Sequence, residues 1–161
     1  MPSSRLRIYW DADVWLSYIN GEGGRLPTLD AILADSSSPK GEIELYTSEM
    51  SEVEVAFAKA EQDKKALDSD VEKQIDALWD DSETLKVVEY HHTIGIEARK
   101  IIRMGMEKGW QLKPMDAIHL ATAKFIGVSE FHTYDKRLLK YSNEVGFPII
   151  EPRTSQPRMI P

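Results

Sequence analysis

Five short apolar segments alternate with helix-like segments along this chain, and this alternation constrains its fold more than any other feature. The strand-like segments lie within residues 5–10, 42–47, 85–90, 127–133 and 147–150. Runs of apolar and β-branched residues bounded by turn residues indicate strands, and the segments between them carry apolar residues at helical spacing. Strands that are separated by helices form parallel sheets. We therefore expect an α/β fold with a central, mainly parallel sheet.

The pattern also predicts how the chain is organised around this sheet. Helices are expected over residues 14–19, 27–35, 48–58, 69–79, 93–108, 115–124 and 134–141, while residues 60–65 are highly charged and expected to fray. A chain of 161 residues is long enough to bury the core of one domain. We expect that domain to cover residues 1–150, followed by an irregular, proline-rich tail over residues 151–161.

Composition narrows the class of protein. The chain has no cysteine, which excludes disulfides and thiolate chemistry and fits a reducing cytoplasm. It has no apolar run of membrane-spanning length, so no membrane association is expected. Residues 1–90 hold 9 Lys/Arg against 20 Asp/Glu, whereas residues 91–161 hold 11 against 7. The basic second part leaves room for phosphate binding, for which Lys113 and Arg137 are the candidates.

One acid stands near the start of the helix expected over residues 115–124. Asp116 follows Pro114, a residue favoured at the first helical position, so it falls in the first turn, where the helix dipole favours an acid. Apolar side chains, Leu120 and Phe125 among them, predict that this helix packs inside the domain. A carboxylate in such surroundings needs a cation, a donor or a metal nearby, although a plain helix N-terminal acid also accounts for it.

Two further acids follow strand-like segments directly. Asp11 ends the first segment and Asp135 follows the fourth, each where a helix is expected to begin. The carboxyl ends of parallel strands lie at one edge of a sheet, and ligands of open α/β folds bind there. Helix capping is the simpler interpretation of Asp11 and Asp13, but a cap needs only one acid.

A fourth acid is expected on the helix over residues 48–58. Ser48 is its natural N-cap, although Ser51 could serve instead, and the helix carries both Glu52 and Glu54. The two glutamates lie about 200° apart around the helix axis, so only one can face the strand ends. Glu54 has the more apolar neighbours, and we therefore expect Glu54 in the site and Glu52 in solvent.

The four acids Asp11, Glu54, Asp116 and Asp135 are thus expected along one edge of the sheet. Clustered carboxylates repel one another unless a cation lies between them. A ligand set made only of oxygen suits Mg²⁺ or Mn²⁺. Such an ion can activate water and neutralise charge on phosphate, so the chemistry indicated is hydrolysis of a phosphodiester.

At these residues the sequence resembles the PIN-domain family, and most of all the VapC-like toxin ribonucleases of bacterial toxin–antitoxin pairs. The resemblance runs over roughly residues 6–150, in family order. It rests on four blocks: Asp11-Ala-Asp13-Val, Ser48-x-x-Ser51-x-x-Glu54-Val, Asp116-Ala-Ile-His-Leu-Ala-Thr-Ala123 and Thr133-Tyr-Asp135.

The resemblance implies a three-layer α/β/α fold and an endoribonuclease that uses Mg²⁺ or Mn²⁺. Its four acidic metal and catalytic positions fall on Asp11, Glu54, Asp116 and Asp135, with Glu54 a ligand directly or through water, and its polar supporting positions fall on Ser48 and Thr133. Asp13 stands at another supporting position, where the family usually has Asn, Ser or Thr. The resemblance also implies an RNA substrate, an antitoxin that lies across the site, and a homodimer.

Two alternatives remain open at this point. A PIN-fold protein without activity would serve as a module that binds protein or RNA, and it would have no reason to bind Mn²⁺. A phosphate-handling regulator of the receiver class also clusters acids at strand ends. That class needs a lysine after a late strand and a phosphoacceptor aspartate in mid-chain, and neither is convincing here.

Overall fold

The strands form one sheet in which every neighbouring pair is parallel. The structure is a computed structural model that describes residues 5–154. Its five strands are β1 (Leu6–Trp10), β2 (Ile43–Ser48), β3 (Leu85–Val88), β4 (Glu130–His132) and β5 (Ile149–Ile150), in the spatial order β3-β2-β1-β4-β5. The central position of β1 places the residue that follows it at the middle of the carboxyl edge. The expected α/β fold with a parallel sheet is confirmed.

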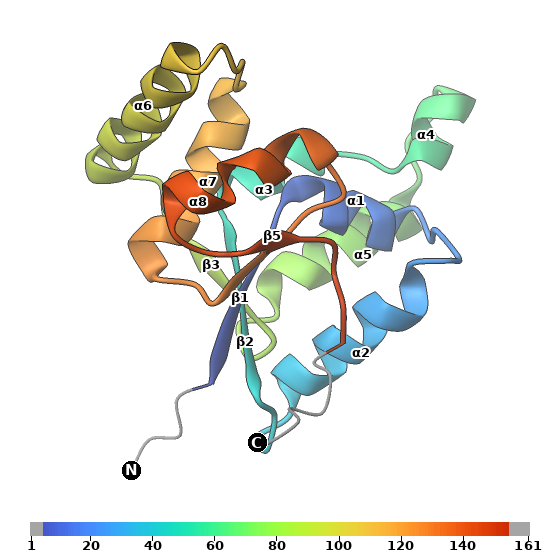
Figure 1. Ribbon diagram of the computed structural model, residues 1–161. Coiled ribbons are helices and arrows are strands. Elements are labelled where there is room, and N and C mark those ends of the chain that lie inside the picture. The colour runs from blue at the N-terminus through green and yellow to red at the C-terminus, as the bar shows by residue number, and fades with distance from the viewer. Residues whose placement is uncertain (1–4, 155–161) are drawn as a thin grey trace.

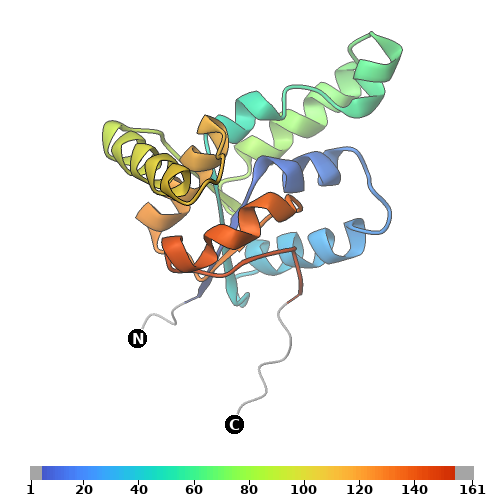
Figure 2. The same ribbon diagram turned by 45° about the horizontal axis from the view of Figure 1, so that its top comes forward.

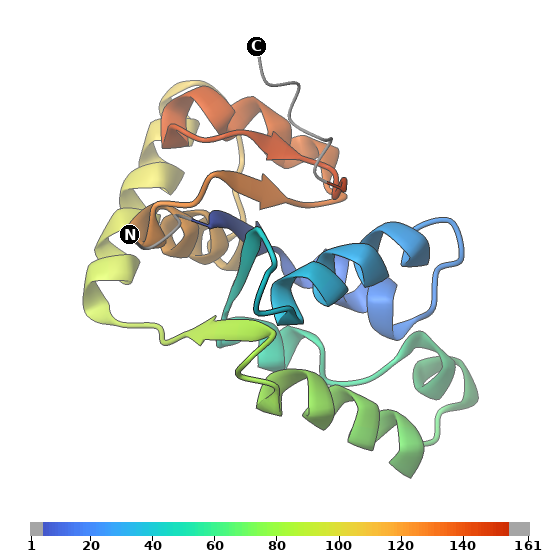
Figure 3. The same cartoon turned by 90° about the horizontal axis from the view of Figure 1, so that it is seen from below.

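Helices cover both faces of this sheet, which makes three layers (Figures 1 and 3). Side chains of β1 alternate, so that Ile8 and Trp10 enter one core and Tyr9 enters the other. The first core is closed by α1 (Ala12–Ile19), α2 (Leu26–Ser37) and α5 (Ser69–Asp80). The second is closed by α6 (His92–Glu107), α7 (Pro114–Ile126), the 3₁₀ helix η1 (Lys136–Tyr141) and α8 (Ser142–Val145).

Helix α7 lies inside the domain, as its composition predicts. Leu120 and Ala121 are fully buried against α6 and the sheet. The expectation is wrong for Phe125, which is 58% exposed. Its ring lies on the outer face of the helix and meets the edge of His91, with ring centroids 4.7 Å apart. None of the helices in the described part of the chain combines the length and the apolar character needed to cross a bilayer.

The largest difference from the sequence-based expectation follows β2. The helix expected over residues 48–58 is only α3 (Met50–Glu54), because Val55 leaves the helix and is buried in the core beside α1 and α2. A second short helix, α4 (Lys59–Lys64), forms where fraying is expected. The carboxylate of Glu61 stabilises it by accepting the backbone N–H groups of Ala58 (2.9 Å) and Asp68 (2.8 Å). Figure 2 shows α4 projecting with the start of α5.

Smaller differences concern the ends of the chain. Helix α8 is not expected from the sequence, and β5 is shorter than the predicted segment 147–150. Residues 151–154 have no helix or strand, and the remainder of the predicted tail lies outside the described residues.

Substitution of Gly41 by alanine is expected to destabilise the fold. An added Cβ would lie 1.8 Å from the backbone oxygen of Asp35, whose carboxylate accepts the N–H groups that lead into β2. The backbone must shift to relieve this clash, and we expect a loss of about 2 kcal/mol in the free energy of unfolding. Chemical denaturation measures it. Gly23→Ala is the control, since its Cβ meets no atom within 4 Å, and an equal loss in both variants would contradict the assigned cause.

Candidate active site

Three of the predicted acids lie together at the carboxyl edge of the sheet. Asp11 follows β1 directly, and its backbone N–H donates to the carbonyl of His132 at the end of β4 (3.1 Å). Asp135 follows β4 as the N-cap of η1. Asp116 lies in the first turn of α7, close enough to Asp11 and Asp135 that both charges raise its pKa. The topology of the sheet thus assembles residues that are 124 positions apart at most.

Asp11 is the most deeply buried of these acids. Its Oδ1 accepts the N–H of Ala12 (2.7 Å), which makes it the N-cap of α1, and its Oδ2 accepts the hydroxyl of Thr133 (3.0 Å). Burial raises the pKa of Asp11, and the nearby His119 and the Ala12 N–H only partly oppose this rise. The carboxylate is therefore kept in surroundings that disfavour its charge.

Thr133 joins Asp11 to the additional acid Asp13. Its Oγ1 also lies 3.0 Å from Oδ2 of Asp13, and it accepts the backbone N–H of Asp135 (3.0 Å). A hydroxyl carries one hydrogen, so it can donate to only one carboxylate at a time. Burial, followed by the charge of Asp11, raises the pKa of Asp13 to about 7. A protonated Asp13 can donate to Thr133 while Thr133 donates to Asp11, which satisfies all three groups.

Thr133→Val is expected to lower the free energy of unfolding by about 2 kcal/mol. Valine keeps the shape of threonine but removes the donor to Asp11 and the acceptor for the Asp135 N–H, in a buried place without water to replace them. Thermal unfolding measures the effect. Thr154→Val, at an exposed position, should change little. Equal stability of wild type and Thr133→Val would show that this hydroxyl does not hold the acids in place.

The pKa of Asp116 is also strongly raised. Its carboxylate is half-buried, and burial, followed by the charges of Asp11 and Asp135, raises its pKa to about 6. The charge of Glu54 acts in the same direction, while His119 opposes it. The mutual repulsion of these acids is the electrostatic property that a bound cation would remove.

Glu54 reaches the site through a histidine that the sequence-based analysis does not identify as a site residue. His119 is fully buried, and its Nε2 lies 2.5 Å from Oε1 of Glu54 and 3.6 Å from Oδ1 of Asp11. Its Nδ1 lies 2.6 Å from the hydroxyl of Tyr9. Glu52, by contrast, is exposed, as expected. His119 could have been predicted as a site residue from its position three residues after Asp116. This spacing places both side chains on one face of a helix that is otherwise largely apolar.

The pKa of His119 reflects this crowded position. Burial alone would lower it, but the hydrogen bond to Glu54 and the charges of Asp11, Glu54 and Asp116 outweigh burial and raise the pKa above its ordinary value. The imidazole is therefore a source of positive charge or of N–H donors among the acids.

Asp135 is paired with one of the predicted phosphate-binding residues. Arg137 donates from Nε to Oδ1 (3.0 Å) and from Nη2 to Oδ2 (2.8 Å) of Asp135. This pair, with the backbone N–H of Arg137 and the charge of Lys113, lowers the pKa of Asp135. Lys113 precedes α7 and is exposed, so both predicted cations lie beside the acids on the solvent side.

Ser48 takes a position different from the one expected. Its Oγ accepts the N–H of Met50 (3.1 Å), but the N-cap of α3 is Glu49. The hydroxyl that ties β2 to the end of β1 belongs to the neighbouring Thr47, which donates to the carbonyl of Trp10 (2.8 Å) and contacts Ser51 (2.8 Å). In this structure Ser48 orders the turn after β2, and Thr47 supports the strand that carries Asp11.

The side-chain oxygens at this edge are ligands of the kind that a divalent cation binds. They are carboxylate oxygens, which Mg²⁺ and Mn²⁺ prefer, and burial together with the neighbouring carboxylates raises the pKa values of Asp13 and Asp116. Within residues 5–154, however, no three His, Asp or Glu side chains are grouped so as to hold an ion. The contacts of Glu54 with His119 and of Asp135 with Arg137 engage two of the four acids. Binding an ion through Asp135 would require Arg137 to release this carboxylate, whereas Glu54 contacts His119 through Oε1 alone and can act with its other oxygen.

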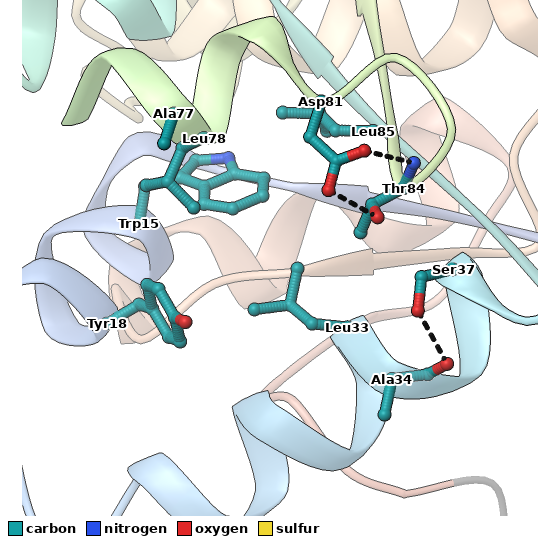
Figure 4. Close-up of a pocket in the computed structure, with 10 residues that line it drawn as sticks. All are labelled: Trp15, Tyr18, Leu33, Ala34, Ser37, Ala77, Leu78, Asp81, Thr84 and Leu85. Atoms are coloured by element: carbon teal, nitrogen blue, oxygen red, sulfur yellow. Dashed lines mark hydrogen bonds between the residues drawn. The ribbon is translucent and has the colours of Figure 1, made fainter. Parts of the chain in front are cut away.

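A cavity of about 280 Å³ lies elsewhere, between α1, α2 and α5. Figure 4 shows Trp15, Tyr18 and Leu33 facing it. Its one carboxylate, Asp81, accepts from the N–H (3.2 Å) and the hydroxyl (2.7 Å) of Thr84. The carboxylate of Asp81 is thus already satisfied, the lining is otherwise mostly apolar, and none of the predicted site residues lines the cavity.

The sequence matches the PIN domain family over residues 8–144, which is most of the chain. The chain belongs to the PIN domain family. The family predicted from the four sequence blocks that contain these acids is therefore confirmed. No curated protein matches the sequence of this PIN domain.

Solved structures of several bacterial proteins have the same fold. VapBC2 from Rickettsia felis, bound to a promoter DNA fragment, superposes with a TM-score of 0.62 at 10% identity, over 92% of this PIN domain and 100% of that chain. VapC20 from Mycobacterium tuberculosis, described as a toxin that cleaves the sarcin–ricin loop, has a TM-score of 0.62 at 17% identity, over 91% and 99%. FitAcB from Neisseria gonorrhoeae has a TM-score of 0.62 at 15% identity, over 90% and 97%. At these identities the likeness establishes the fold.

Proposed function

We propose that this PIN domain is an endoribonuclease that hydrolyses RNA phosphodiester bonds with the help of Mg²⁺ or Mn²⁺. The observation that carries the proposal is the acid cluster at the carboxyl edge, in which burial and neighbouring carboxylates raise the pKa of Asp116 to about 6. Without a cation, repulsion between these carboxylates lowers the stability of the folded protein. Their presence together therefore supports a cation-binding role.

Each acid has a distinct role in this proposal. Asp11, Asp116 and Asp135 would hold the ion, and Glu54 would act on it directly or through water. A bound divalent ion supplies the charge that stabilises the transition state at phosphorus and favours deprotonation of the attacking water. Thr133 keeps Asp11 oriented through its hydroxyl (3.0 Å). Asp13 adds a carboxyl that is largely protonated below a pH of about 7.

In this proposal Lys113 and Arg137 bind the phosphates of the RNA. Both are exposed beside Asp135, and the planar guanidinium of Arg137, which pairs with Asp135 in this structure, would contact phosphate once Asp135 binds the ion. RNA as the substrate is supported by the structural likeness to VapC20, whose description names an RNA target.

We further propose that the protein is the toxin of a toxin–antitoxin pair and acts in the cytoplasm as a homodimer. The structural likeness to VapC20, which is described as a toxin, supports this part of the proposal. Co-expression with the product of a neighbouring small reading frame, followed by purification through a tag on one protein, tests this part. A stable complex with suppressed cleavage is expected, whereas cleavage unaffected by every such product contradicts it.

The test of the proposed activity is a comparison of nucleic acids. Purified protein is incubated with end-labelled RNA and with DNA of the same sequence in Mn²⁺ or Mg²⁺, and the products are resolved by size. We expect internal cleavage of RNA and much slower cleavage of DNA. Equal cleavage of both would overturn the assignment of RNA as the substrate.

A binding module without activity is the second candidate. The pairing of Glu54 with His119 and of Asp135 with Arg137 favours it, because both acids already have partners. Calorimetric titration with Mn²⁺ separates the two readings. Heat of binding that is lost in Asp116→Asn supports the nuclease, and absence of binding supports the module.

A further inference from the structure

His119 has a partner on each side of its ring. On α7 it is fully buried, with Nε2 2.5 Å from Oε1 of Glu54 and Nδ1 2.6 Å from the hydroxyl of Tyr9. Tyr9 is itself fully buried, and its ring packs edge-on to the imidazole, with centroids 5.7 Å apart. The ring of His119 is therefore fixed by packing and by two hydrogen bonds.

This arrangement determines what the imidazole offers to Glu54. An ionised carboxylate only accepts hydrogen bonds, so Nε2 must carry a proton. Nδ1 accepts from the Tyr9 hydroxyl in the neutral ring and donates to it in the charged ring. In both states Nε2–H donates to Oε1 of Glu54, because Tyr9 satisfies the other nitrogen in either case.

Glu54 depends on such a donor for its position. It is the last residue of the five-residue helix α3, the chain leaves helical geometry at Val55, and a glutamate side chain has three rotatable bonds. Its side chain is 27% exposed, so burial alone does not fix it. The hydrogen bond from His119 holds Oε1 within the site, near Asp11, whose Oδ1 is 3.6 Å from the same nitrogen.

We propose that His119 is a positioning residue that holds Glu54 in its working orientation, with Tyr9 fixing the imidazole behind it. This inference rests on the proposed nuclease function of the same site. It extends the acid cluster inward from the carboxyl edge to a support formed by two buried side chains from α7 and β1. Partners of this kind around an acidic centre contribute about 10–100-fold to affinity or rate.

Substitutions at His119 separate positioning from folding. His119→Leu removes the donor and should lower kcat by about 30-fold, with the KM for RNA within about 2-fold of wild type. His119→Gln keeps an N–H near the position of Nε2 and should recover most of the lost rate. Tyr9→Phe keeps the ring but removes the hydroxyl, and should lower kcat by about 5-fold. A loss that is equal in His119→Leu and His119→Gln would overturn the proposal.

A double-mutant cycle shows whether His119 acts through Glu54. If it does, His119→Leu should cost little further activity in a Glu54→Gln background. If the fold-loss of activity in the double variant equals the product of the two single losses, His119 acts independently of Glu54. That result would overturn the proposal.

A spectroscopic measurement on the protein without added metal tests the contact apart from activity. Long-range ¹H–¹⁵N spectra resolve the two nitrogens of His119, and Glu54→Gln should shift the Nε2 signal. Glu52→Gln, at an exposed position on the same helix, should leave it in place. An unmoved Nε2 signal in Glu54→Gln overturns the proposal. A shifted signal in a protein that cleaves no RNA overturns the proposed nuclease, and with it the role of His119 in catalysis, but not the contact.

Discussion

Replacing Asp116 with asparagine is expected to lower the rate of RNA cleavage by about 10³-fold while leaving the fold intact. Asparagine has nearly the same volume but lacks the charge that a divalent cation needs. The position of Asp116 among other acids, with its pKa raised to about 6, means that removal of its charge relieves repulsion. The thermal midpoint of the variant should therefore equal or exceed that of wild type, and loss of activity cannot be attributed to unfolding.

Asp70→Asn is the matched control for this substitution. Asp70 also lies in the first turn of a helix, α5, but it is exposed. Asp70→Asn removes a charge that interacts with the helix dipole in the same way. This variant therefore measures the effect on stability and cleavage of removing a helix N-terminal acid alone. We expect wild-type cleavage from Asp70→Asn. Wild-type cleavage from Asp116→Asn as well would remove Asp116 from the active site.

The second large effect concerns pH. In buffer without divalent ions, raising the pH from about 5 to about 8 is expected to lower the free energy of unfolding by about 3 kcal/mol, or Tm by about 10 °C. Asp13 and Asp116 have pKa values of about 7 and about 6 in the folded protein, above the value of 3.8 for an unperturbed aspartate. Between these pKa values and 3.8 the folded state binds more protons than the unfolded state. The free energy of unfolding therefore falls as the pH rises through about 6 and about 7.

Histidines modify this slope in opposite directions. The raised pKa of His119 adds to the loss of stability with rising pH, while the lowered pKa of buried His132 opposes it. Asp13→Asn should flatten the dependence, and Asp30→Asn, at an exposed position, should not. Thermal melts at several pH values measure this. A flat or rising profile in wild type would show that the acids are not forced together.

Divalent cations should reverse this loss. A ligand present at about 100 times its Kd stabilises the folded state by about 2.7 kcal/mol. Because the cation competes with protons for the same carboxylates, Mn²⁺ should raise Tm more at a pH of about 8 than at about 5. An equal rise at both values would indicate binding at a different place.

The fold can be predicted from the sequence because the pattern that determines it is local. Alternating apolar segments and helices, with Asp11 and Asp135 each following a strand, are sufficient to predict a parallel sheet and the edge at which these acids lie. The position of Glu54 rather than Glu52 could also be predicted, because helical periodicity alone separates their faces.

What the sequence did not reveal depends on contacts between distant residues. The helix expected over 48–58 ends early because Val55 is drawn into the core, and α4 forms because Glu61 accepts two backbone N–H groups. The role of His119 depends on Tyr9 and Glu54, which lie 110 and 65 residues away along the chain. The hydroxyl that supports β1 belongs to Thr47 and not to Ser48, because neighbouring side chains of a strand lie on opposite faces of the sheet.

The acids at the carboxyl edge are proposed to form a divalent-ion centre for RNA hydrolysis. The most direct test of this proposal is the rate of RNA cleavage by the wild-type protein after treatment with EDTA, and again after Mn²⁺ or Mg²⁺ is restored in excess. We predict no cleavage with EDTA and full recovery with either ion. Cleavage that persists in EDTA, or protein that cuts no RNA under any ion condition and shows no calorimetric binding of Mn²⁺, would contradict the account.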